Sequence, residues 1–174
     1  PISFSAYKGE ILGLSGQLGS GAGEVLASIA GALKSRSGSL TINDENFLPK
    51  SPSQAIKKKI AYCSSDRKKD GLFLGRPIFE NLTSPALSSI SKYGFNFGST
   101  EQDFSKSLAK EFLIDVKRMF DESGLLSGGN QQKVALGKWL SIKPDVLLVN
   151  EPTRGVDVGA KSEIYQRMRD LAAR

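Results

Sequence analysis

Hydrophobic positions along the chain fall into short apolar runs and longer stretches with a helical period. The short runs, at 10–16, 60–65 and 145–149, are typical of buried strands. Residues 38–43 instead alternate apolar and polar side chains, as an edge strand does. Helices are predicted from the apolar positions Val25, Leu26, Ile29, Ala30 and Leu33, from the run between Asn130 and Leu140, and from Ile164, Met168 and Leu171.

The order of these elements predicts an α/β fold, because strands joined by helices pair in parallel. The pair Ser51–Pro52 marks the start of a short helix before the second strand, with serine as N-cap and proline in the first turn. The segment that begins at Gly71 is more helical than extended. We therefore expect a single domain with a core at 1–70 and 130–174 and a helical subdomain inserted at 71–129.

Composition narrows the functional classes. A chain of 174 residues with 39% hydrophobic content can bury a real core, which argues against disorder. The net charge of +6 would suit an anionic partner, but the basic residues are scattered and favour a solvated surface. The chain has no histidine, which removes the usual neutral-pH base and the commonest metal ligand. The single cysteine fits a reducing compartment, no apolar run approaches a membrane span, and the abrupt ends predict a piece of a longer protein.

A glycine-rich turn separates the first predicted strand from the first predicted helix. Glycines at such a turn allow positive φ and let backbone N–H groups approach a phosphate at the helix N-terminus. The spacing is that of a phosphate-binding P-loop, but Ala22 and Gly23 occupy its lysine and hydroxyl positions. Taken alone, the turn also fits a plain strand-to-helix connection. The candidate nucleotide-binding residues here are Gly16, Gly19, Ser20, Gly21, Ala22, Gly23 and Glu24.

A second glycine motif precedes the helix predicted from Asn130. Ser127, Gly128 and Gly129 can present N–H and O–H donors to a phosphate, and we expect no packing role for this arrangement. Gln131 completes this candidate binding set.

The third motif follows the apolar strand at 145–149. Asn150 and Glu151 end the strand, and Pro152 turns the chain out of the sheet. A carboxylate at the carboxyl end of a parallel strand can orient an attacking water beside a phosphate. Glu151 is therefore the candidate catalytic residue.

These motifs in this order resemble those of the ATP-binding-cassette (ABC) ATPases. "LSGGNQQKV" at 126–134 resembles the cassette signature, and "EPTRGVDVGAK" at 151–161 resembles the Walker B end and D-loop of bacterial monosaccharide importers. "SSDRKKDGLFLGRPIFENL" at 64–82 is similar to the Q-loop region of the same branch. The likeness covers nearly the whole chain and is closer to the second, C-terminal cassette of the double-cassette subunit in ribose, galactoside and xylose importers.

The resemblance implies a P-loop NTPase (RecA-like) core with a mostly parallel sheet, an antiparallel edge sheet and a helical subdomain that carries the signature. It implies ATP and Mg²⁺ as cofactors. It also implies a second nucleotide-binding domain and an integral membrane permease as partners, with a sugar-binding protein as an indirect one. The expected location is peripheral, on the cytoplasmic face of the cell membrane.

The chain departs from the family pattern around its own nucleotide site. Ala22 and Gly23 replace the Walker A lysine and serine, and Asn150 replaces the Walker B aspartate, so that no metal ligand is assigned. Ser65 stands where a Q-loop glutamine or glutamate is expected. In such cassettes the signature serves the nucleotide held by the opposite cassette. The resemblance therefore predicts a degenerate site here and an intact contribution to the partner's site.

Two other interpretations stay open at this level. The positive charge would suit a soluble ABC ATPase that acts on nucleic acid or ribosomes, but the importer-type segments argue against a nucleic-acid partner. The other interpretation is a structural cassette that binds no nucleotide.

Overall fold

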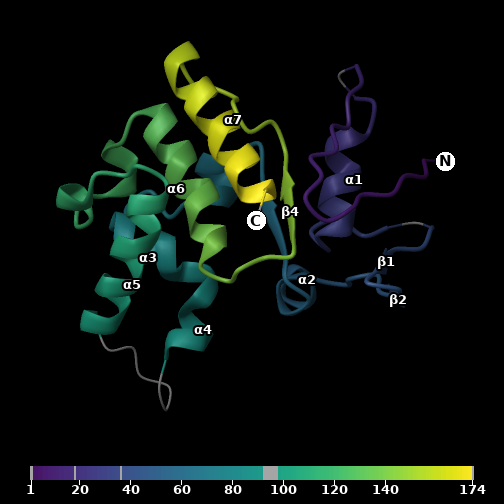
Figure 1. The fold of residues 1–174 in the computed structure, drawn as a ribbon, viewed down its shortest axis with the longest axis horizontal. Helices are drawn as coiled ribbons and strands as arrows, with labels where there is room; N and C mark the ends of the chain where they lie inside the picture. Colours follow the sequence, from purple (N-terminus) through teal and green to yellow (C-terminus); the bar gives the residue numbers. More distant parts are fainter. Residues whose placement is uncertain (1, 18, 36, 92–97, 174) are drawn as a thin grey trace.

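The computed structural model describes residues 2–17, 19–35, 37–91 and 98–173 (Figure 1). The first elements along the chain are α1 (Ala22–Ile29), β1 (Thr41–Ile42), β2 (Glu45–Asn46), α2 (Pro52–Lys57), β3 (Ile60–Cys63) and a π-helical turn, η1 (Arg67–Gly71). The helical segment follows, with α3 (Ile78–Thr83), η2 (Ser84–Ala86), α4 (Leu87–Ile90), α5 (Gly98–Glu111), η3 (Val116–Arg118) and η4 (Ser123–Leu125). The last elements are α6 (Gly128–Leu140), β4 (Val146–Val149) and α7 (Val158–Ala172).

Two strands form a parallel sheet at the centre of the molecule. β3 pairs with β4, with Ile60 opposite Val146 and Cys63 opposite Val149. Ile60 and Leu148 pack in the hydrophobic cluster shared with α1 and α2, whereas Cys63 and Val149 pack with α6. Figure 1 shows the same arrangement, with α1 on one side of the strands and α6 on the other. Both faces of the sheet are therefore covered, as is usual for parallel strands.

A small antiparallel sheet lies at the edge of the molecule. β1 and β2 form a hairpin in which Ile42 stands opposite Glu45. Its turn residues Asn43 and Asp44 have φ values of 49° and 65°. Two-residue hairpin turns of type I′ require positive φ at both positions, and asparagine and aspartate tolerate it. The strand predicted at 38–43 is thus confirmed in kind but is only two residues long.

The strand predicted at 10–16 is wrong. This segment has no regular secondary structure, and Ile11 and Leu12 are 52% and 40% exposed. Among the described strands, β1 pairs with β2 and β3 pairs with β4, and none pairs with this segment. A strand needs a ladder partner for its backbone N–H and C=O groups, and an apolar run in the sequence does not provide one.

Helix α1 is shorter than its apolar spacing predicted. It ends at Ile29, and Gly31 follows with a φ of 68°. A glycine in the left-handed region ends many helices. Gly31 also lies close to the segment before α2, because a Cβ there would be 2.7 Å from the Ser51 carbonyl oxygen. Leu33, predicted to lie on the helix, lies beyond it and is 45% exposed.

The other predicted helix signals agree with the structure to within a few residues. Ser51 caps α2, and its Oγ accepts a hydrogen bond from the Gln54 N–H at 3.4 Å. Helix α6 begins at Gly128 rather than Asn130. Ile164, predicted on the apolar face of the last helix, is buried in α7.

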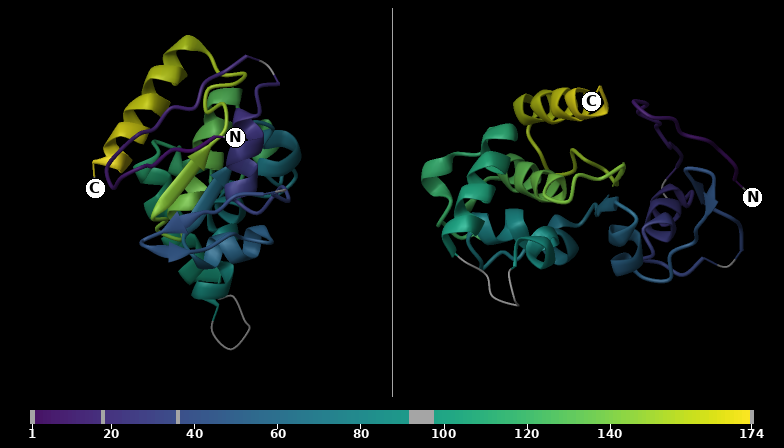
Figure 2. Two further views of the ribbon diagram at one scale, coloured as in Figure 1. Left: turned by 90° about the vertical axis from the view of Figure 1, so that its right-hand side faces the viewer. Right: turned by 60° about the horizontal axis from the view of Figure 1, so that its bottom comes forward.

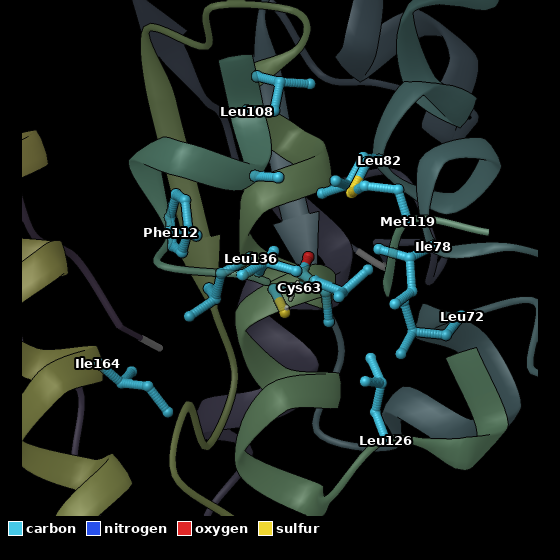
Figure 3. Packing of buried hydrophobic residues seen from close by; sticks show 14 of the residues in the cluster. Cys63, Leu72, Ile78, Leu82, Leu108, Phe112, Met119, Leu126, Leu136 and Ile164 are labelled. Atoms are coloured by element: carbon cyan, nitrogen blue, oxygen red, sulfur yellow. Dashed lines mark hydrogen bonds between the residues drawn. The ribbon is translucent and has the colours of Figure 1, made fainter. Parts of the chain in front are cut away.

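One large hydrophobic cluster joins the helical segment to the rest of the molecule (Figure 3). It contains Leu82 of α3, Phe112 after α5, Leu136 of α6, Cys63 of β3 and Ile164 of α7. The cluster therefore runs across the expected boundary between the core and the helical subdomain. That division stays a prediction.

The N-terminal elements form a separate group. Figure 2 shows α1, α2 and the hairpin on one side of the sheet and the helical segment on the other, while α7 packs on α6. A smaller cluster built on Ala30, Ala55, Ile60 and Leu148 holds this group to the strands. Among the helices of the described residues, none is long and apolar enough to cross a membrane.

Candidate functional site

Two glycines of the turn before α1 have a left-handed backbone conformation. Gly19 and Gly21 have φ values of 83° and 90°, in the region that favours glycine. A Cβ at Gly16 would lie only 2.6 Å from the Ser20 Cβ, so that Ser20 folds back against the turn. An open hollow of about 540 Å³ lies beside the turn, lined by Ile2, Gly13, Leu14, Ser15, Ser20, Gly21, Ala22 and Val25.

Helix α1 begins at Ala22 without a capping side chain, because its N-cap is Gly21. First-turn N–H groups have no acceptor within their own helix, so those of Ala22, Gly23 and Glu24 are available to an anion. The Ala22 methyl group adds no charge, and the exposed Glu24 adds a negative one. The hydrogen-bond donors that the first turn of α1 offers are therefore backbone N–H groups.

The structure places the turn directly against the end of β4. A Cβ at Gly23 would lie 2.9 Å from Asn150 Nδ2. Magnesium prefers oxygen ligands such as hydroxyl and carboxylate groups, and these two positions supply neither. Within the described part of the chain, no group of three or more His, Cys, Asp or Glu side chains could hold a metal ion. The side chains that meet here therefore lack the usual magnesium ligands.

Glu151, the candidate catalytic residue, lies in a strained turn. Its φ of 49° is in the left-handed region, which costs a non-glycine residue about 1–2 kcal/mol. Its Oε2 lies 3.4 Å from Nη1 of Arg154, and both side chains are more than half exposed. The carboxylate is thus paired within its own turn, and its catalytic role stays a prediction.

Ser127 caps the helix that carries the signature motif. Its Oγ accepts a hydrogen bond from the Asn130 N–H at 3.4 Å, and the residue is exposed. The hydroxyl therefore lies at the surface, next to the positive end of a 13-residue helix. These are the donors that the sequence predicts for a phosphate.

The expectation that the signature glycines have no packing role is wrong. A Cβ at Gly128 would lie 2.5 Å from the Gly155 carbonyl oxygen, and one at Gly129 would lie 2.8 Å from the Ala160 Cβ. The first turn of α6 therefore packs against the loop before α7 and against α7 itself, at distances that only glycine permits. Packing explains these glycines independently of any ligand.

The two glycine motifs lie on opposite faces of the sheet. α1 belongs to the cluster on one face, and α6 belongs to the cluster on the other. The structure brings Gly23 to Asn150, but no hydrogen bond among the described residues joins Ser127 to the turn before α1. The two glycine motifs are therefore separate from each other in the structure.

Arg67 is not among the residues that the sequence singles out, because the scattered basic residues favour a solvated surface. Its Nη1 donates to the Arg154 carbonyl at 2.7 Å, its Nη2 to the Gly155 carbonyl at 3.3 Å, and its Nε to Gln131 Oε1 at 3.3 Å. The available signal was its position just beyond the strand predicted at 60–65, since residues at the carboxyl ends of parallel strands often form sites.

Gln131, predicted to contact the ligand, is buried and 5% exposed. Its Oε1 accepts from Arg67, and its Nε2 donates to the Ser123 carbonyl at 3.3 Å. Both ends of the amide are used within the protein. These partners argue against a direct contact with nucleotide.

The single cysteine is a core residue. Cys63 is 2% exposed, and burial raises the pKa of its thiol to about 11. Burial also lowers the pKa of the neighbouring Lys138, whose ammonium donates to the Gly71 carbonyl.

We expect Cys63 to react with a disulfide reagent at least about a hundredfold more slowly in the native chain than in the unfolded chain at pH 7.5, because its thiol is buried and its pKa is raised. A pKa near 11 leaves about a hundredfold less thiolate than the usual value near 9. The release of chromophore, followed with and without denaturant, measures the two rates. A native rate within threefold of the unfolded rate would contradict the buried position.

The chain shares its fold with solved structures of ATP-binding cassettes. The dimeric, post-hydrolysis structure of the ATP-binding cassette MJ0796 bound to ADP and Pi superimposes with a TM-score of 0.81 at 23% identity, over 97% of this chain and 72% of that one. A structure of MJ1267, an ATP-binding cassette of an ABC transporter, gives a TM-score of 0.77 at 23% identity, over 99% of this chain and 70% of that one. These likenesses confirm the predicted P-loop NTPase fold.

Sequence comparison then defines the family. Residues 1–154 match the family model described as "ABC transporter", and the chain belongs to this family. Proteins named "Ribose import ATP-binding protein RbsA" are 49% identical over 173 residues in Streptococcus agalactiae, 46% over 175 in Lactococcus lactis and 45% over 172 in Bacillus cereus. The alignments cover 98–99% of this chain but only 34–35% of each relative, in its C-terminal half. The predicted resemblance to the second cassette of sugar importers is confirmed.

Proposed function

We propose that this chain is an ATP-binding cassette of a sugar importer of the ribose type. In this proposal it works beside a second nucleotide-binding domain, and both dock on an integral membrane permease at the cytoplasmic face of the membrane. ATP drives the transport, and a sugar-binding protein delivers the sugar to the permease. The name shared by the relatives, ribose import ATP-binding protein, supports this substrate class.

The observation that carries the proposed pairing with a second cassette is an imbalance between two half-sites. One is the turn before α1, and the other is the signature half-site, Ser127, Gly128 and Gly129 at the start of α6. At the turn before α1, Ala22 stands at the position for a cation and Gly23 at the position for a hydroxyl ligand. Asn150, after β4, stands at the position for a carboxylate ligand. A charge-assisted contact contributes about 1.5–3 kcal/mol, so that its loss weakens nucleotide binding by about ten- to a hundredfold. We infer that the chain's own turn binds ATP and Mg²⁺ weakly or not at all.

The signature half-site keeps everything that its proposed role needs. Ser127 offers a hydroxyl at the surface, and the positive end of α6 carries about half a unit charge. Gly128 and Gly129 have no side chains that could block a phosphate. These groups would contact the nucleotide held by the partner cassette, where fixed donors stabilise the charge that develops during phosphoryl transfer.

Restoring the missing side chains tests the proposed weakness of the chain's own turn. We expect Ala22→Lys, Gly23→Ser and Asn150→Asp together to tighten Mg-ATP binding by about ten- to a hundredfold, because they return a cation and two oxygen ligands. Gly23→Ser alone is expected to give no gain, because one hydroxyl restores neither the cation nor the carboxylate. Equilibrium titration of the purified chain with Mg-ATP measures the difference.

Leu33→Lys is the matched control. It adds the same charge at an exposed position beyond the other end of α1, and we expect it to leave Mg-ATP binding unchanged. Two outcomes would count against the proposed weak site. One is an unmodified chain that binds Mg-ATP as tightly as the triple variant, and the other is an unmodified chain that hydrolyses ATP unaided.

A further inference from the structure

Arg67 links three segments that the proposed function needs in a fixed arrangement. It begins η1, the turn that follows β3. Its guanidinium donates to the carbonyls of Arg154 and Gly155 in the loop before α7, and to the side-chain amide of Gln131 in α6. One planar group with five N–H donors thus satisfies acceptors on two other segments.

The guanidinium also lies against the first turn of α6. A Cβ at Gly128 would be 2.9 Å from Nη2 of Arg67 and 2.5 Å from the Gly155 carbonyl oxygen. The start of α6, the loop at 154–155 and the arginine therefore pack without intervening space. The planar fork of arginine fits this geometry, whereas lysine offers a single nitrogen.

The loop has a different attachment to α7. The Thr153 and Tyr165 hydroxyl oxygens are 3.2 Å apart, and Asp157 caps α7 by accepting from the Ala160 N–H at 2.9 Å. Among the hydrogen bonds of the described residues, those of Arg67 tie the loop to α6. Its removal would release one side of the loop and leave the other attached.

We propose that Arg67 is a positioning residue for the signature half-site. By holding 154–155 against the first turn of α6, it fixes the direction of the Ser127 hydroxyl and of the N-terminal N–H groups of the helix. It does not itself contact nucleotide. This role rests on the proposed function, because it concerns the nucleotide held by the partner cassette.

Hydrogen exchange of the purified chain tests the contact itself. In Arg67→Gln, we expect the hydrogen-bonded amides next to the contact, those of Ala160 and Gln131 among them, to exchange about ten- to a hundredfold faster, as the loss of charge-assisted hydrogen bonds predicts. Arg67→Lys keeps the charge, and we expect its exchange rates to lie between those of the parent chain and those of Arg67→Gln. Lys68→Gln is the matched control, because it removes the same charge from an exposed position in the same turn. Exchange in Arg67→Gln that equals the control overturns the inference, whatever the protein does.

ATP hydrolysis by the assembled importer tests the consequence. We expect Arg67→Gln to lower kcat by about tenfold or more, with KM for ATP changed less than about threefold, because the nucleotide itself is bound by the partner. A merely structural role would loosen the loop without this loss of kcat. Ser127→Asp separates the two levels of the proposal. If it stops hydrolysis while Arg67→Gln does not lower it, the inference fails and the proposed function stands; if neither variant lowers hydrolysis, the proposed function fails and takes the inference with it.

Discussion

Ser127→Asp is expected to lower ATP hydrolysis by the assembled importer more than about a hundredfold, as the loss of a fixed donor at developing charge does in other enzymes. The free energy of unfolding of the chain is expected to change by less than about 0.5 kcal/mol, because aspartate caps helices as well as serine does. The substitution therefore keeps the N-cap of α6 and places a carboxylate where the proposed function requires a triphosphate to approach. Hydrolysis rates and denaturant unfolding measure the two effects separately.

Ser127→Asn is the matched control for this test. Asparagine also caps helices, carries no charge and can donate a hydrogen bond, so that we expect most of the hydrolysis to remain. Full activity in Ser127→Asp would show that no phosphate comes near the start of α6. The signature role proposed for this chain would then be wrong.

The second large effect concerns stability. We expect Gly128→Ala to lower the free energy of unfolding by about 1–3 kcal/mol, the usual cost of forcing an extra group into a packed site. The added Cβ would meet the Gly155 carbonyl oxygen at 2.5 Å, and a backbone carbonyl cannot rotate away as a flexible side chain can. Urea denaturation with an unchanged m-value would measure this loss.

Gly159→Ala provides the comparison. Gly159 lies in the first turn of α7, where a Cβ would be at an ordinary distance of 3.4 Å from Asp157 Oδ1. Alanine favours a helix over glycine by up to about 1 kcal/mol, so that we expect this variant to be as stable as the parent or more so. Equal stabilities of the two variants would contradict the close packing of the signature turn.

Elements fixed by neighbouring residues could be predicted from the sequence. Ser51 caps its helix through an N–H three residues away, and the spacing of apolar residues located α6 and α7. The failures lie where a distant partner decides the outcome. Residues 10–16 have no ladder partner among the described strands, and α1 ends at a glycine that packs on the Ser51 carbonyl.

The same limit applies to the candidate site. The sequence located the turn with its left-handed Gly19 and Gly21, and it marked Asn150 as unusual. It could not show that Gly23 and Asn150 meet, because 127 positions separate them. Arg67 is a similar case, since its carbonyl partners lie 87 and 88 residues further along the chain. A local charge pattern contains no information about such contacts.

The close approach of Gly23 to Asn150 also limits how this site can evolve. A serine that arises first at position 23 has to displace the Asn150 side chain and finds no carboxylate, and an aspartate that arises first at position 150 finds no hydroxyl with which to share a metal ion. Neither single substitution therefore supplies the pair of magnesium ligands by itself. Under the proposed function, a cassette that carries glycine and asparagine at these positions therefore depends on its partner cassette to hold the nucleotide.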